Sequence, residues 1–436
     1  MMKTSQLYAS FLTALALANV PAANAATRTV CFELRIADDR TNCPVTSTPG
    51  AKRGCDPDHN IDAVGHVYEL WDKDDAANAP DEYIGKWVIS GSGRRCATFE
   101  WENSEDDYDL GEDNPDVYVR YINRVNRTTG GAIYVQGVDA DGSSVDVTSW
   151  RNGDGVDPDA YVAEECTVGH NCEIVPNGSL VPESDTASER GMRIQALDSA
   201  QHALETYGAI MDTSVELHYP GKAGCDPSCF VSRSEIHVAE AFGDDAFYPA
   251  HEFGHAVQMQ EFNQDYLRDV CGDSHTLTSS ETDSCSTTEG WADYVAVVSW
   301  YEPNNKNSKP EAFGYKFEAA APYAPVCEDN GGIELQVAKA FWDLDDAKTE
   351  EGHAPAAESQ YDWSNYATRD IAKGWRNFPD GTDTYTNDYY ESDDGVNVYA
   401  YYYNNWYNPP FTDNGPDFFE TLLNHNCLEW QDDYMP

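Results

Sequence analysis

Two histidines and a glutamate share one short segment, and their spacing is that of a metal-binding helix. The segment reads His251-Glu252-Phe253-Gly254-His255, an HExxH pattern. Residues four apart lie on the same helical face, so both imidazoles can reach one metal while the glutamate flanks it as a general base. Apolar residues recur here at the helical period and predict a buried face: Ala250, Phe253, Gly254 and Val257.

A second pair of candidate residues follows in the segment Glu289-Gly290-Trp291-Ala292-Asp293. Two histidines and Glu289 would make a three-ligand set, which leaves the fourth position of a tetrahedral Zn²⁺ open for water, as in catalytic zinc sites. Asp293 lies one helical turn from Glu289 and is placed to accept the remaining ring N–H of a liganding histidine.

These residues resemble the gluzincins, the thermolysin-like clan of HExxH peptidases, and the Glu-Gly-Trp-Ala-Asp segment is similar to the fungalysin-type branch. The resemblance implies His251, His255 and Glu289 as zinc ligands and Glu252 as the general base. It also implies that Asp293 orients the first histidine. The similarity in element order extends over about residues 188–347 and covers neither the N-terminal part nor the tail.

The resemblance implies a substrate strand and shows one departure. An edge strand before the HExxH helix pairs with the substrate backbone in this clan, and Glu235, Ile236, His237, Val238 and Ala239 occupy that place. The clan also uses a histidine and a tyrosine to stabilise the oxyanion, but Glu334 stands where that histidine is expected. The alternatives elsewhere stay open: Tyr266, His275, His353 and His425.

The elements around these motifs predict a multidomain protein. Residues 26–180 carry short apolar runs of period two and a linker, which indicate an all-β sandwich. Residues 181–436 are expected to form an α+β zincin domain, with a core at about 185–350 and a small, mainly helical or irregular C-terminal region at 351–436. In the core, helices are predicted over 188–210, 247–262, 287–301 and 332–347, and strands over 214–219 and 234–239.

The first 25 residues have the features of a signal peptide: Lys3, an apolar run, and small residues around Ala25. The mature chain is therefore expected to be secreted, with the periplasm as an alternative. Twelve cysteines fit disulfide bonds formed in an oxidising compartment. Short separations favour three local pairs: Cys166 with Cys172, Cys225 with Cys229, and Cys271 with Cys285.

The chain is strongly acidic, with 77 acidic against 27 basic residues and a formal charge of −50. Such a surface disfavours nucleic acid and anionic membranes as partners and favours solubility, so a soluble monomer is expected. A Ca²⁺ site is weakly indicated by oxygen donors whose spacing is not that of an EF-hand: Asn152, Asp154, Asp157 and Asp159.

The function expected from these features is that of a secreted zinc metalloendopeptidase acting on proteins or peptides. The rival is an extracellular adhesive or matrix-binding protein in which the β-sandwich binds and the metal site is vestigial. Metal content measured together with proteolysis separates them, because the rival would bind zinc weakly and leave casein or gelatin intact.

Overall fold

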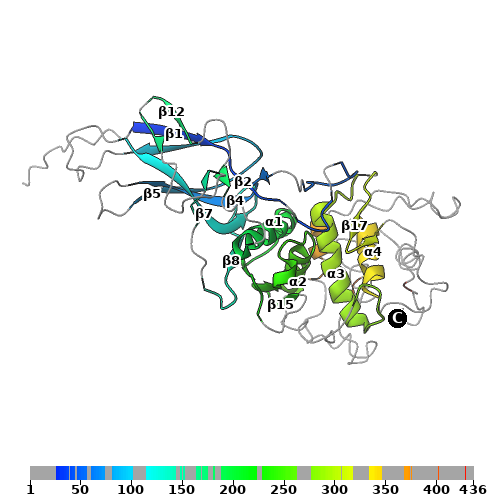
Figure 1. Cartoon of the computed structure of the whole chain (residues 1–436). Coiled ribbons are helices and arrows are strands. Elements are labelled where there is room, and N and C mark those ends of the chain that lie inside the picture. Colours follow the sequence, from blue (N-terminus) through cyan, green and yellow to red (C-terminus); the bar gives the residue numbers. More distant parts are fainter. Residues whose placement is uncertain are drawn as a thin grey trace, which may run out of the picture.

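The fold is that of a computed structural model. It describes residues 26–38, 40–44, 47–55, 60–73, 81–101, 114–143, 148–149, 151–152, 164–167, 169–174, 180–181, 188–222, 228–262, 276–305, 307–317, 333–345, 368–373, 375, 401 and 428. Within this part of the chain the elements make a β-rich, multidomain protein, with the N-terminal strands on one side and the main helices on the other (Figure 1). Among the described residues, no helix is both long and apolar enough to cross a bilayer.

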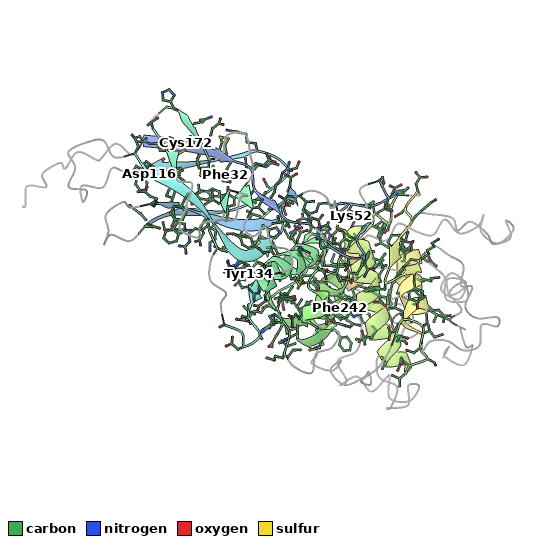
Figure 2. All side chains as sticks on the ribbon, in the orientation of Figure 1. Phe32, Lys52, Asp116, Tyr134, Cys172 and Phe242 are labelled. Carbon is green, nitrogen blue, oxygen red and sulfur yellow. A yellow bond between two sulfur atoms is a disulfide. The ribbon has the colours of Figure 1, made fainter. Side chains whose placement is uncertain are left out.

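Two sheets in the N-terminal part share one hydrophobic core. The smaller has the order β12-β1-β6, and strands β7, β4 and β5 of the larger sheet complete the core. Phe32 of β1, labelled in Figure 2, and Leu70 of β4 are buried in it. The strands are β1 (Ala26–Phe32), β2 (Arg35–Ile36), β3 (Ile61–Asp62), β4 (His66–Asp72), β5 (Glu82–Val88), β6 (Arg95–Trp101), β7 (Asp116–Asn126), β9 (Thr148–Ser149), β10 (Arg151–Asn152), β11 (Glu164–Glu165), β12 (Asn171–Glu173) and β13 (Leu180–Val181).

The larger sheet runs on into the second half of the chain. Its order is β15-β16-β14-β8-β7-β4-β5, with β8 (Tyr134–Val138), β14 (Val215–His218), β15 (Ser228–Ser232) and β16 (Glu235–Val238). β8 pairs antiparallel with the end of β7 and parallel with β14. One sheet therefore joins both regions, and the domain limits expected near residue 180 stay a prediction. The remaining short strands, β17 (Glu311–Ala312) and β18 (Tyr315–Lys316), pair with each other.

The helices pack on one face of this sheet. They are α1 (Glu189–Tyr207), α2 (Tyr248–Phe262), α3 (Asp283–Trp300), α4 (Glu334–Asp345) and α6 (Thr368–Lys373), with a short 3₁₀ helix η1 (Glu240–Phe242). Leu217 of β14 and Ile236 of β16 are fully buried in the core that these helices form. Because alternate strand residues point to opposite faces, their neighbours lie on the face away from the helices.

Polar residues determine where these helices begin. Ser188 caps α1 by accepting a hydrogen bond from the Gly191 amide at 3.0 Å. Asp245 Oδ1 accepts from the Phe247 and Tyr248 amides at 2.7 and 3.0 Å, which satisfies the start of α2. Thr282 caps α3, which therefore begins four residues before the predicted position 287.

The segment before β3 is held against the helices by buried ion pairs. Asp198 of α1 is fully buried and accepts from Arg40 Nη1 at 2.7 Å and Arg53 Nη2 at 2.9 Å. His66 Nε2 lies 3.1 Å from the same carboxylate. The two arginines hold the pKa of Asp198 well below its ordinary value, against the opposing effect of burial. This network joins the N-terminal part to α1.

Most predicted helices and strands of the core are present, and the predicted pair Cys166–Cys172 is confirmed. The disulfides Cys31–Cys96 and Cys43–Cys55 carried no sequence prediction. Cys229 and Cys285 are each disulfide-bonded, but their expected partners, Cys225 and Cys271, lie outside the described residues. The signal peptide and most of residues 351–436 lie outside them as well.

Candidate metal centre

The two helices that carry the motifs approach each other closely because of small residues. A side chain on Gly254 of α2 would come within 2.9 Å of the Ala292 Cα in α3. Trp291 donates from Nε1 to the Gly254 carbonyl at 3.0 Å and fixes the pair. Gly290 lets α4 pack equally close, since a Cβ there would lie 2.7 Å from the Glu334 carbonyl oxygen. The Gly-Trp-Ala residues between Glu289 and Asp293 thus set the distance between helices.

This packing brings His251, His255 and Glu289 together. His251 Nε2 lies 3.1 Å from Glu289 Oε2 and 3.2 Å from His255 Nε2, and His255 Nε2 lies 3.3 Å from the same glutamate oxygen. The three side chains are only 12, 7 and 11% exposed, in the order His251, His255 and Glu289. Three potential donor atoms therefore form a small, nearly equilateral triangle at a mostly buried position.

The size of this triangle fits a zinc ion. In a tetrahedral site with bonds of about 2.0–2.1 Å, donor atoms lie about 3.3–3.4 Å apart. The three distances are within a few tenths of an ångström of that value. Two imidazole nitrogens and a carboxylate are also the donor set of many catalytic zinc sites. The residues present could hold zinc through these three atoms.

Asp293 lies behind the first histidine. Its Oδ1 is 2.9 Å from His251 Nδ1, so His251 donates its Nδ1–H and directs Nε2 toward His255 and Glu289. Burial disfavours the imidazolium, but the hydrogen bonds to Asp293 and Glu289 outweigh it and raise the pKa of His251 well above its ordinary value. A positive charge is therefore stabilised at this position.

Burial and the two histidines also shift the pKa values of Glu289 and Asp293. Burial alone would raise the pKa of Glu289, but the neighbouring His255 and His251 lower it well below the ordinary value. For Asp293, burial prevails over the interaction with His251, and its pKa is raised. Glu252 follows His251 on α2 and is 4% exposed. Of these carboxylates, Glu289 is the one whose ionised form is favoured.

Aromatic residues without a sequence signal border the site. The Phe313 ring lies 6.1 Å from the His251 ring and 5.4 Å from the Tyr248 ring, measured between centroids. Phe313 has a φ of 52° in the turn between β17 and β18. Only the tertiary structure brings this turn to α2.

Two groups of predicted site residues lie outside the described part of the chain. The first is the set of oxyanion alternatives, Tyr266, His275, His353 and His425, and the second is Asp154, Asp157 and Asp159 of the expected Ca²⁺ site.

The expected substrate strand occupies a different position from the predicted one. Glu235–Val238 form β16, which pairs in parallel with β14 on one side and antiparallel with β15 on the other. The prediction that this segment is an edge strand is therefore wrong, and Ala239 lies just beyond it. In the described part of the sheet, β15 is the edge strand beside β16 and pairs only with it. A role of Glu235–Ala239 in substrate binding stays a prediction.

The comparisons with known proteins point to one family. The family model described as the mycolysin C-terminal domain matches residues 212–392. These residues include α2 and α3 with the whole donor triangle and Asp293. The similarity supports a metallopeptidase family and hence peptidase activity, a metal cofactor and protein substrates. No curated protein matches the chain.

Proposed function

We propose that the protein is a secreted zinc-dependent metalloendopeptidase with a gluzincin-type site. The single observation that carries this proposal is the donor triangle of His251, His255 and Glu289, with sides of 3.1 to 3.3 Å. The assigned roles are zinc ligands for these three residues, general base for Glu252, and orientation of His251 for Asp293. The similarity of residues 212–392 to the mycolysin C-terminal domain supports the same reaction class.

The charge of the site supports a cation rather than an incidental cluster. With Nδ1–H donated to Asp293, His251 turns a lone pair toward the Glu289 carboxylate, and His255 Nε2 lies at the third corner. Three acceptors this close repel one another unless a proton or a metal lies between them. A Zn²⁺ ion bound by the three donor atoms would remove this repulsion.

The chain's residues would then divide the work of hydrolysis. Bound zinc would supply Lewis acidity toward the scissile carbonyl and the attacking water. Glu252 takes a proton from that water and delivers it to the leaving amine. Glu289 and the two histidines fix the position of the reaction, and Asp293 keeps the His251 ring in the correct tautomer.

The substrate backbone is best placed along the edge of β15 that pairs with no other described strand. α2 packs against both β15 and β16, so this edge lies on the strand pair that supports the HExxH helix. A peptide added there would gain main-chain hydrogen bonds, which bind without selecting a particular sequence. The site is therefore suited to internal peptide bonds of extended protein segments.

A digestion experiment separates this function from the adhesive rival. The mature protein, incubated with casein and with a mixed peptide library, should cleave both, and a zinc chelator should abolish cleavage until zinc is restored. Mass spectrometry of the products identifies the cleaved bonds. Intact casein with less than one tightly bound zinc per chain would favour the matrix-binding protein.

Replacing Asp293 tests the position assigned to it. Asp293→Ala removes the acceptor of the His251 Nδ1–H, so zinc affinity is expected to fall roughly 10- to 100-fold. Asp293→Asn keeps a carbonyl acceptor without the charge and should lose less. Titration with a competing chelator at fixed pH measures both. Equal zinc dissociation constants in the wild type and Asp293→Ala would show that Asp293 does not support a metal ligand.

A further inference from the structure

A second cluster of histidine and glutamate lies on the opposite face of the sheet. β14 and β16 are parallel neighbours with Glu216 opposite Glu235 and His218 opposite His237. Leu217 and Ile236, between them, face the helices. The two histidines and two glutamates therefore form a block on the outer face, and the sheet separates it from the donor triangle on α2 and α3.

Three residues of this block are close enough to share an ion. Donor atoms of His218, Glu235 and His237 all lie within 4.8 Å of one another. Glu235 Oε1 is 2.8 Å from His237 Nε2 and 3.6 Å from His218 Nε2. The two rings stack with centroids 4.2 Å apart. Glu216 Oε2 is 3.8 Å from His218 Nε2 and adds negative charge at the rim.

His218 is the unusual member of the block. Its side chain is only 4% exposed, yet neither ring nitrogen has a hydrogen-bond partner among the described residues. The distances of 3.6 and 3.8 Å to the two glutamates are too long for hydrogen bonds. A buried polar group without a partner costs free energy, so its retention needs a reason such as an ion.

A polar pocket opens beside the same residues. It has a volume of about 340 Å³, and Glu216 and Glu235 form part of its wall together with Gln136 of β8. Tyr134, labelled in Figure 2, also lines it. Solvent and ions thus have a route to the carboxylate side of the block, while the two imidazoles are buried.

We propose that His218, His237 and Glu235 form a second binding site for a divalent transition metal, distinct from the catalytic site. Two imidazoles with one carboxylate favour Zn²⁺ over Ca²⁺ or Mg²⁺, which prefer oxygen donors. The ion would join β14 to β16 and reach solvent through the pocket. Its role would be to stabilise the sheet, because ion binding to the folded state alone raises stability.

Binding requires three local rearrangements. His237 Nδ1 accepts from the Lys222 amide at 3.2 Å, while Nε2 donates to Glu235. Coordination through Nε2 moves the ring proton to Nδ1, so the amide must turn away and the stacked rings must tilt about their broad χ2 torsions. Lys222 Nζ, 3.1 Å from Glu235 Oε1, must also leave. Lys222 therefore competes with the metal for this carboxylate.

Counting zinc in paired variants of the mature protein tests the second site. The wild type, loaded with zinc and freed of excess, should hold two ions per chain by elemental mass spectrometry. His251→Ala should hold one, because only the first site is lost. Glu235→Gln, which preserves shape, should also hold one. The double variant His218→Asn/His237→Asn should behave in the same way, with circular dichroism as the check on folding.

The competing lysine gives an independent measurement. Lys222→Met should bind zinc at the second site several-fold more tightly in calorimetric titration of the His251→Ala protein, whereas the exposed control Lys316→Met should not. Two results overturn the inference: a His251→Ala protein that holds no zinc, or a Glu235→Gln protein that still holds two ions. If the wild type holds one ion and Glu235→Gln holds none, the catalytic zinc site is refuted and the second site is supported.

Discussion

Glu252→Gln should leave zinc bound and remove peptide hydrolysis. Glutamine preserves the size of the side chain on α2 but cannot accept the proton from the attacking water. The ligands His251 and His255 are unchanged, so the zinc content should equal that of the wild type. We expect kcat/KM to fall on the order of 10³-fold or more, the scale of a lost general base combined with metal-assisted hydrolysis. Peptide cleavage rate and zinc stoichiometry are the two measurements.

The matched control is the same change further along the helix. Glu261 is also a buried glutamate of α2, roughly 13 Å along the axis from Glu252 at 1.5 Å per residue. Glu261→Gln should keep its zinc and most of its activity. Near-normal turnover by Glu252→Gln would remove the proposed mechanism even if the metal site proved correct.

Asp198→Ala should strongly destabilise the contact between α1 and the N-terminal part of the chain, although Arg40 keeps its bond to Asp38. It would leave Arg40, whose side chain is 1% exposed, and Arg53 without their shared carboxylate. Breaking a buried ion pair by removing one partner costs about 3–5 kcal/mol of unfolding free energy. Urea titration followed by fluorescence, with reversibility checked, measures the loss.

An exposed pair of the same kind serves as the control. Asp212 contacts Arg233 with side chains that are 62 and 35% exposed, so Asp212→Ala should cost less than about 1 kcal/mol of unfolding free energy.

The stabilisation by Asp198 should also depend on pH in a definite direction. Its pKa is depressed in the folded state, so its contribution is complete above the unfolded value and is lost as the pH falls through the folded value. Equal losses for both variants at neutral pH would contradict the assigned role of the network.

The Asp198 network also bears on how the chain is organised. Three side chains of the N-terminal part converge on Asp198 of α1: Arg40, Arg53 and His66. In addition, β8 pairs directly with β14. The N-terminal part thus supports the sheet on which α2 packs. We therefore expect it to be needed for the stability of the metal centre, whether or not it also binds a partner.

Local sequence determined the elements that carry the site. The helical period and the HExxH spacing placed α2 within one residue of its observed start, because a buried helical face repeats along the chain. The short alternating apolar runs of residues 26–180 likewise predicted a region of β-strands. The pair Cys166–Cys172 followed from short separation alone. α3 begins four residues earlier than predicted, because Thr282 caps it.

Tertiary structure decided what local patterns do not encode. The pairing of β8 with β14 and the interior position of β16 depend on contacts between segments far apart in sequence, which leave no periodic signal. The same holds for the convergence of three basic residues on Asp198. The stacking of His218 on His237 also required the register of two parallel strands. Sequence thus specified the donor types and the helix that presents them, whereas long-range packing set their distances and created the second cluster.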